Sequence, residues 1–209
     1  MVQLTQLSKK KEVLFLLDKS IPYAEIWMSR ERELPVKEQA LPEGFQFTFY
    51  QEGDEREWAA IETAVAEFED ETQALDYFER SFAPYTEELK QRMLFITDPS
   101  GEKVGTASAW WKKAPNGDRY PLVHWVAVKP GYQGKGLAKA MMTRTLKTLQ
   151  TLEDTSPIYL HTQTWSHAAI RLYQKLGFEI TDKKLDGSPN LEYKKAMDIL
   201  SGLENSKKD

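Results

Sequence analysis

Alternating and continuous apolar runs predict the strands of one sheet. Phe45, Phe47 and Phe49 alternate with polar residues, which is the period of a strand with one buried face. Turns rich in Gly, Pro, Asn and Asp separate the three runs between residues 93 and 128, so these runs form an antiparallel meander. The predicted strands are residues 13–17, 21–28, 45–50, 93–97, 104–111, 122–128, 157–162, 178–181 and 191–197.

Apolar residues spaced by three and four predict the helices that lie between these strands. The acidic stretch at residues 52–88 contains one or two helices, because apolar residues fall at helical spacing in 58–68 and again in 75–82. Residues 134–149 form another helix. A further helix begins at Ser166, a residue type that caps helix N-termini, and ends before Gly177, a residue type that favours the position after a helix. Helices between strands, after a meander, predict a mixed α/β sheet flanked by helices on both faces.

The length and the patterns together predict one main domain. A chain of 209 residues is typical of a single large domain. We predict that residues 45–200 form it, that residues 1–44 are an N-terminal extension with two short strands packed on the core, and that residues 201–209 are a polar tail. The apolar run at residues 13–17 is too short to cross a bilayer or to act as a secretory signal, so we expect a cytoplasmic protein without a membrane partner.

The composition excludes several kinds of chemistry. The chain has no cysteine, which rules out disulfides, thiolate zinc sites and a cysteine nucleophile. Its three histidines, His124, His161 and His167, lack the spacing of a helical metal-binding pair, and we predict no metal site. The net charge of −4 argues against a nucleic-acid binder, which generally carries a basic face.

Charge is distributed unevenly along the chain. Residues 52–88 contain thirteen Asp or Glu and two Arg, a local balance of −11. Residues 129–147 contain five Lys or Arg and no acid. The basic stretch would attract phosphates and the acidic stretch would repel them.

The stretch from His124 to Ala138 carries the most specific signal. It reads as a buried strand, a tight glycine-containing turn and the start of a helix. Gly134 and Gly136 have no Cβ, so a ligand can approach their backbone closely, and a helix start leaves several N–H groups unpaired. With three nearby lysines, such a turn suits a phosphate or a diphosphate. The alternative is a glycine-rich turn used only for tight packing.

The amino-acid sequence of this turn does not match two common phosphate-binding motifs, but it resembles a third motif. A Walker loop needs Ser or Thr where Gly136 stands, and the dinucleotide fingerprint needs a small residue where Lys139 stands. The run Gln133-Gly134-Lys135-Gly136-Leu137-Ala138 instead resembles the Gln/Arg-x-x-Gly-x-Gly/Ala pattern of the acetyl-CoA-dependent N-acetyltransferases of the GNAT superfamily. Residues 166–178 are similar to that family's Asn-x-x-Ala-Ile-x-Leu-Tyr-x-Lys-x-Gly-Phe motif, with Ser in place of Asn.

The resemblance covers roughly residues 45–197 and implies the GNAT-like acyl-CoA N-acyltransferase fold, with acetyl-CoA as co-substrate. It implies that the backbone of Val126, Ala127 and Val128 pairs with the pantetheine arm like an added strand. The N–H groups from Gln133 through Ala138 would hold the diphosphate, and Ser166 would contact the pantetheine region. A backbone N–H near Val126 would polarise the acetyl carbonyl.

The same resemblance suggests two catalytic residues. Tyr173 would be the general acid that protonates the departing thiolate, because a phenol with a pKa of about 10 is protonated at neutral pH; the alternative is a core aromatic residue. His124 would be the base that takes the proton of the attacking amine, directly or through water. Strand alternation places His124 on the same face as Val126 and Val128. A packed, hydrogen-bonded histidine is the alternative.

The sequence therefore predicts an N-acetyltransferase that passes an acetyl group from acetyl-CoA to a primary amine within a ternary complex. Glu67, Glu69 and Asp70 are candidates for attracting a cationic amine, and a solvated helical face is the alternative for these carboxylates. A non-catalytic acyl-CoA-binding or regulatory module is the principal alternative function, and a third hypothesis makes the acceptor a lysine or N-terminus of a partner protein. The sequence leaves the acceptor and the oligomeric state open, a homodimer included.

Overall fold

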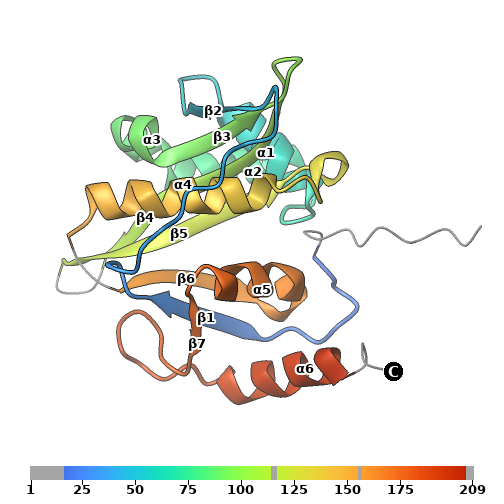
Figure 1. The fold of residues 1–209 in the computed structure, drawn as a ribbon, viewed down its shortest axis with the longest axis vertical. Coiled ribbons are helices and arrows are strands. Elements are labelled where there is room, and N and C mark those ends of the chain that lie inside the picture. The colour runs from blue at the N-terminus through green and yellow to red at the C-terminus, as the bar shows by residue number, and fades with distance from the viewer. Residues whose placement is uncertain (1–16, 114–116, 155–156, 206–209) are drawn as a thin grey trace, which may run out of the picture.

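The computed structural model describes residues 17–113, 117–154 and 157–205, which form one seven-stranded mixed sheet (Figure 1). The strand order is β2-β3-β4-β5-β6-β1-β7, and every neighbouring pair is antiparallel except β5 and β6. The strands are β1 (Glu25–Arg30), β2 (Gln46–Phe49), β3 (Met93–Thr97), β4 (Lys103–Lys113), β5 (Arg119–Val128), β6 (Ile158–Gln163) and β7 (Glu179–Thr181). This architecture confirms the predicted mixed α/β fold class.

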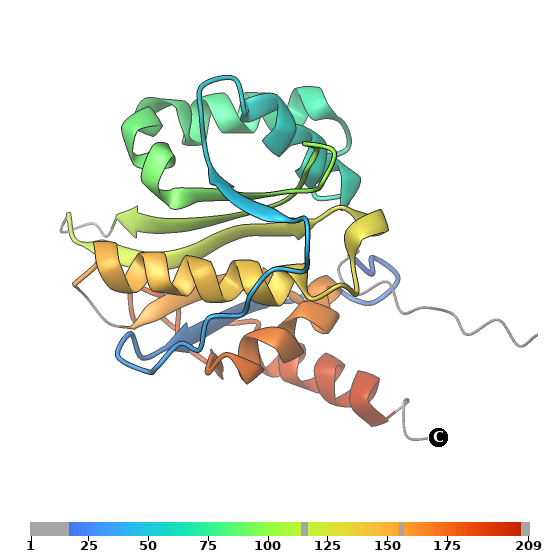
Figure 2. The same ribbon diagram turned by 45° about the horizontal axis from the view of Figure 1, so that its top comes forward.

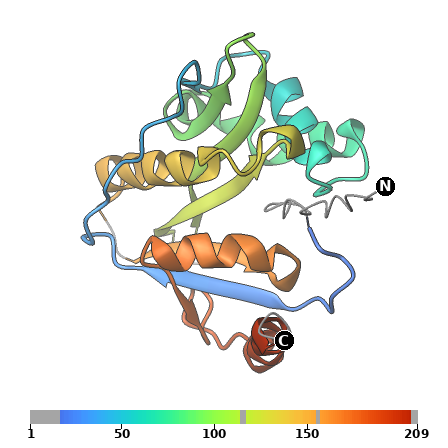
Figure 3. The ribbon, with the colours of Figure 1, turned by 45° about the vertical axis from the view of Figure 1, so that its right-hand side comes forward.

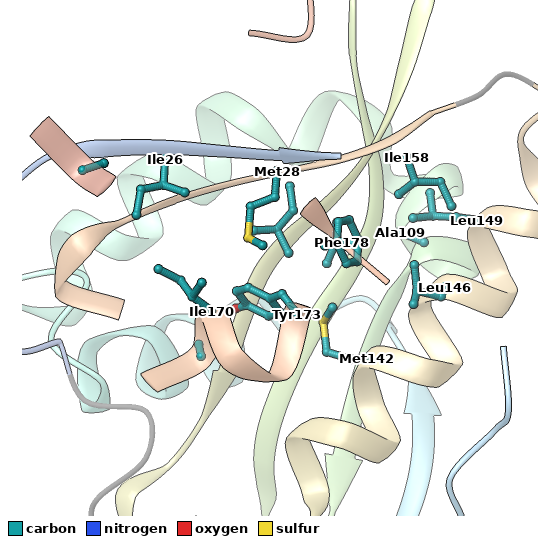
Figure 4. Close-up of a cluster of buried hydrophobic side chains, with 14 of the residues drawn as sticks. Ile26, Met28, Ala109, Met142, Leu146, Leu149, Ile158, Ile170, Tyr173 and Phe178 are labelled. Carbon is teal, nitrogen blue, oxygen red and sulfur yellow. The ribbon is translucent and has the colours of Figure 1, made fainter. Parts of the chain in front are cut away.

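Helices cover both faces of the sheet (Figure 2). They are α1 (Glu55–Ala64), α2 (Glu71–Ser81), α3 (Thr86–Arg92), α4 (Leu137–Leu152), α5 (His167–Lys175) and α6 (Tyr193–Asn205). The first three surround the fully buried Trp58 on one face. The other three enclose a second core, in which Met142 and Ile170 gather around the sheet residue Met28 (Figure 4). None of the described helices is both long enough and apolar enough to span a bilayer.

The N-terminal part of the chain contributes a strand to the interior of the sheet. β1 lies between β6 and β7, although its residues fall in the predicted extension 1–44. Met28 of β1 is fully buried, because alternate residues of the strand point into the core. The segment that follows β1 crosses α4, where the Arg32 guanidinium donates to the Gln150 carbonyl at 2.7 Å. The described part of the extension thus belongs to the same packed unit as residues 45–200.

The C-terminal prediction is wrong in its element type. The predicted strand at residues 191–197 is instead the beginning of α6, and residues 201–205 of the predicted polar tail continue that helix. Ala196, Ile199 and Leu200 are spaced by three and four, and they pack against the core that contains β1. This helical spacing decides the element, because a strand would have turned alternate residues of the segment away from that core. Two further parts of these predictions lie outside the described residues: 13–16 and 206–209.

Candidate active site

The sheet opens between β5 and β6. These strands pair only at Leu122–Tyr159 and Val123–Leu160, and beyond these pairs they diverge, as Figures 1 and 3 show. From Trp125 onward, β5 has no partner strand on that side within the described sheet. Because β5 and β6 are parallel, the opening lies at the carboxyl ends of both strands, which is the usual place for a ligand in a sheet of this kind.

A β-bulge shapes the β5 edge of the opening. Trp125 and Val126 together face a single residue of β4, Ala107, and Trp125 has a positive φ of 50°. The extra residue reverses the alternation of side chains beyond it. Val126 and Val128 therefore pack on the α4 side, whereas the ring of His124 contacts the aromatic core under α1–α3. The prediction that His124 shares a face with Val126 and Val128 is wrong for this reason.

A cavity of about 240 Å³ lies at the opening. Its walls come from β5, β6, α5 and the region of α1. Four of the predicted site residues line it: His124, Val126, Ser166 and Tyr173. The side chains of Ala127 and Val128 are buried in the protein core, so a ligand can reach only the backbone of these two residues.

The predicted phosphate loop forms the turn between β5 and α4. A short 3-10 helix, η2 (Pro130–Tyr132), precedes it, and α4 begins at Leu137. Gly134 and Gly136 have positive φ values of 75° and 84°, and no described atom comes within 4 Å of a Cβ built on either glycine. The backbone of both glycines thus borders open space, as a turn that cradles a ligand requires. The N–H groups in the first turn of α4 have no intrahelical partner, as at any helix start.

The other residues of this loop hold its shape. The Gln133 side chain donates from Nε2 to the Val128 carbonyl at 2.8 Å, which ties the loop back to β5. Leu137 and Ala138 are 1 % and 6 % exposed, so their side chains anchor α4 in the core. The Lys135 ammonium lies 4.9 Å from the centre of the tyrosine ring in η2. The loop therefore offers a ligand its backbone N–H groups and one lysine, while its apolar side chains stabilise the fold.

Tyr173 lies on α5 and is both a core residue and a cavity residue. It is 5 % exposed and lines the cavity, and Figure 4 shows it beside Ile170. Burial raises the pKa of Tyr173 strongly, and the negative charges of Glu67 and Glu62 act in the same direction. The phenol therefore keeps its proton at neutral pH and can donate it to a leaving group.

His124 has the wrong electrostatic surroundings for a base at neutral pH. Burial lowers the pKa of His124 to about 3, and the positive charges of His161 and Lys112 add to that shift. Its Nδ1 is buried and has no hydrogen-bond partner among the described residues. A group with such a low pKa holds a proton weakly, which makes it inefficient as a general base.

His161 also lines the cavity, from β6. Its Nε2 lies 3.1 Å from Oε1 of Glu25, and burial lowers the pKa of His161 despite that carboxylate. Two of the three histidines thus line one cavity. Within residues 17–113, 117–154 and 157–205, no group of three His, Asp or Glu side chains is arranged to hold a metal ion.

Ser166 occupies the N-cap position of α5, as predicted, but its side chain makes no capping hydrogen bond. It lines the cavity, so its side chain faces the ligand space at the helix start. At the other end of α5, Gly177 has a positive φ of 89°, which confirms the predicted role of glycine after this helix.

The cavity contains a carboxyl group that the sequence analysis does not identify. Glu62 is 1 % exposed, and its Oε1 has no hydrogen-bond partner among the described residues. Burial raises the pKa of Glu62 well above its ordinary value, and the charge of Glu67 adds to the shift. The sequence carries a signal for it, because Glu62 stands on the apolar face that Trp58 and Val65 define at helical spacing.

Only Glu67 of the three acidic candidates lines the cavity. Loss of solvent around its carboxyl raises the pKa of Glu67, although a hydrogen bond with Gln163 acts in the opposite direction. Asp70 instead caps α2, where it accepts from the Gln73 N–H at 2.9 Å. Glu69 accepts from the Gln73 side chain at 3.2 Å. The carboxylates of Glu69 and Asp70 therefore stabilise α2 and do not line the cavity.

Comparison with known proteins gives matches over most of the chain. Two mycothiol acetyltransferases are similar to it: one from Pseudarthrobacter chlorophenolicus (32% identical over 168 residues, covering 75% of this chain and 50% of the relative) and one from Salinispora tropica (28% identical over 158 residues, covering 73% and 51%). The chain thus spans about half the length of these curated relatives.

Solved structures support the same fold. A GCN5-related N-acetyltransferase from Sphaerobacter thermophilus superposes with a TM-score of 0.58 at 20% identity, covering 77% of this chain and 49% of that one. The sequence pattern of the acetyltransferase (GNAT) family matches residues 54–178, which include α1, the β5–α4 loop and Tyr173. This match covers more than half of the sequence, and the chain therefore belongs to the acetyltransferase (GNAT) family.

Proposed function

We propose that this chain transfers an acetyl group from acetyl-CoA to a primary amine, by direct attack within a ternary complex. The observation that carries the proposal is the opening between β5 and β6, where β5 leads from the cavity at Val126 directly into the glycine loop. The relatives' name supports acetyl transfer. Their acceptor is not carried over, because this chain spans only about half of their length.

The residues at the opening fit acetyl-CoA. In the described part of the chain, no strand pairs with the backbone from Val126 to Val128 on its open side, so this backbone can pair with the amides of the pantetheine arm. The N–H groups from Gln133 to Ala138, with the positive end of α4, suit the diphosphate. When bound, acetyl-CoA supplies the activated thioester carbonyl that the amine attacks.

The chain's own residues set the route of the reaction. The sequence contains no cysteine, so a thioester acyl-enzyme cannot form and the amine attacks the bound thioester directly. Tyr173, whose raised pKa keeps it protonated at neutral pH, donates its proton to the sulfur of the thiolate as the C–S bond breaks. In this assignment Tyr173, in the last turn of α5, and the loop before α4 act on the same substrate.

The acceptor side of the cavity suits a cation. Glu62 and Glu67 both line the cavity, whereas no Lys or Arg among the described residues does. An alkylammonium is therefore attracted to this end, because it places a positive charge beside two carboxyl groups that have no Lys or Arg next to them in the described cavity lining. We infer that the acceptor enters as a cationic amine.

A ligand panel tests the proposal. Acetyl-CoA or CoA at a hundredfold over Kd should stabilise the folded state by about 2.7 kcal/mol, whereas ATP and NAD should not. A panel of primary amines with acetyl-CoA should then release free thiol, measured spectroscopically. A non-catalytic acyl-CoA-binding module predicts the stabilisation without any amine-dependent thiol release, and failure of CoA to stabilise the protein would contradict both functions.

A further inference from the structure

Glu62 is a buried acid without a structural partner. It lies on α1 and is 1 % exposed, and its Oε1 makes no hydrogen bond with any described residue. Burying a carboxyl group without partners destabilises a protein, and any apolar side chain of similar size would pack better at this position. The fold therefore gains nothing from the carboxyl, and a role toward a ligand accounts for it.

Among the described residues, no Lys or Arg lines the cavity to offset a negative charge on Glu62. The other ionisable groups that line the cavity are Glu67 after α1, His124 on β5, His161 on β6 and Tyr173 on α5. Burial lowers the pKa of both histidines, so they carry no charge at neutral pH. Lys19 lies near this wall, but it donates to the Ala66 carbonyl at 3.0 Å and acts on Glu67 and not on Glu62. The charge of Lys112 acts on the two histidines and not on Glu62.

We propose that Glu62 receives the proton that the cationic amine must lose before it attacks, and that the Glu62 end of the cavity is the amine subsite. The inference rests on the proposed acetyl transfer. It assigns to Glu62 the role that the sequence suggests for His124. A carboxyl group whose basicity is increased by its surroundings is the more effective proton acceptor of the two.

The protons balance in this scheme. In the complex Glu62 is ionised, because the bound ammonium supplies the positive charge beside it that the empty cavity lacks. The ammonium then gives one proton to the Glu62 carboxylate and becomes a neutral amine, whose lone pair attacks the thioester carbonyl carbon. The tetrahedral intermediate collapses as the C–S bond breaks, and Tyr173 gives its proton to the sulfur. The Tyr173 phenolate then takes the remaining extra proton from the amide nitrogen, and Glu62 releases its proton to solvent. The products are the acetamide, CoA thiol and one proton.

The same wall indicates the kind of amine that fits. Trp125 also lines the cavity. The centre of its indole ring lies 5.3 Å from the ring centre of Phe68 and 4.9 Å from that of Tyr77. An aromatic side chain beside a carboxyl group favours an amine that carries an apolar body next to its ammonium. The subsite thus favours small alkylamines with an apolar substituent over polycationic sugars.

The test compares Glu62→Gln with Glu57→Gln, a substitution of the same type at an exposed position of the same helix. The substrate is the most active alkylamine of the panel, together with its mono-, di- and trifluorinated analogues, whose ammonium groups are progressively more acidic. Glu62→Gln should lower kcat/KM for the parent amine by about 10²–10⁴-fold. The loss should shrink with each fluorine, because a more acidic ammonium needs less help to lose its proton. Glu57→Gln should match the unaltered enzyme throughout.

Several results separate the proposal from a structural role. Stabilisation by CoA should be equal in both variants, and Glu62→Asp, which keeps a carboxyl group, should recover part of the activity. An equal loss for every amine in the series, or an unchanged kcat/KM in Glu62→Gln, would overturn the proposal. If Glu62→Gln does not fold, Glu62→Asp carries the same fluorine series and decides in the same way. Absence of turnover by the unaltered enzyme with every amine would overturn the proposed function itself, and this inference with it.

Discussion

The proposed cofactor side and the proposed acceptor side of the cavity are built in different ways. The cofactor side consists of backbone: the open edge of β5, the glycine loop and the first turn of α4, all within residues 126–138. The acceptor side consists of side chains from separate elements, with Glu62 on α1, His124 on β5 and Tyr173 on α5. A backbone site depends on local conformation, whereas a side-chain site depends on how distant elements pack. The acceptor can therefore change by substitution while acetyl-CoA binding is kept.

The largest effect is expected at Tyr173, where the two sides meet. Tyr173→Phe removes the proton donor while the ring still fills the core of α5, so kcat should fall by about 10²–10⁴-fold. Thiol release measured under saturating acetyl-CoA and amine gives kcat, and the thermal shift with CoA reports cofactor binding.

The matched control is Tyr159→Phe, a partly buried tyrosine on β6 that does not line the cavity. This variant should keep kcat. If Tyr173→Phe keeps kcat as well, the leaving thiolate takes its proton from another source and the assignment of the acid fails.

The next largest effect concerns the backbone of the proposed cofactor side and is a rise in the KM for acetyl-CoA. Gly136 has a φ of +84° at the start of α4, a conformation that costs about 1–2 kcal/mol for a residue with a Cβ. Gly136→Val also fills the open space over the loop. The KM for acetyl-CoA should rise about tenfold or more, with the KM for the amine unchanged. Gly202→Val, on the exposed side of α6 with no positive φ, is the control and should leave both values as they are.

The same contrast explains how much of the site the sequence predicts. The glycine loop and Tyr173 lie in continuous sequence motifs, so the local sequence identifies them as candidates without knowledge of packing. The face of His124 is not predictable from alternation, because one extra residue in β5 at Trp125–Val126 reverses it. Glu62 is recognisable as an acid on an apolar helix face, but only the packing of α1 against β5 shows that this face borders a cavity.

The fold shows the same division between local and distant information. The meander and the helix after the glycine loop are predictable because each carries its own turn or cap signal. The place of β1 between β6 and β7 is not, since it depends on pairing with residues 158–163 and 179–181 far along the chain. α6 is misread because a short apolar run fits two periods, and the contacts of Ala196 and Ile199 with the core decide between them.

A smaller effect is expected on the proposed acceptor side, where Glu67 lines the cavity. Glu67 is exposed to solvent, although its carboxyl is partly desolvated at the cavity, so Glu67→Gln should raise the KM for a cationic amine only about two- to fivefold, and less at high salt. The KM for acetyl-CoA should not change. Glu69→Gln is the control, because Glu69 is exposed and bonded to Gln73 and does not line the cavity. Equal KM values for the two variants over a range of salt concentrations would show that Glu67 does not steer the amine.

The smallest effect is the part of the pH dependence of stability that Glu62 contributes. Its folded-state pKa is raised, so between its ordinary pKa of 4.5 and that higher value the folded state binds more protons than the unfolded state. The free energy of unfolding must then fall as pH rises through this window. Glu62→Gln has no such proton, so the stability of this variant relative to the unaltered protein should increase as pH rises from 5 toward the raised pKa of Glu62, as measured by urea unfolding. The free energy of unfolding of Glu57→Gln should change with pH in the same way as that of the unaltered protein, since Glu57 is exposed. A constant difference between Glu62→Gln and the unaltered protein across this range would mean that Glu62 is already ionised in the empty cavity, and that the amine meets a carboxylate with ordinary basicity.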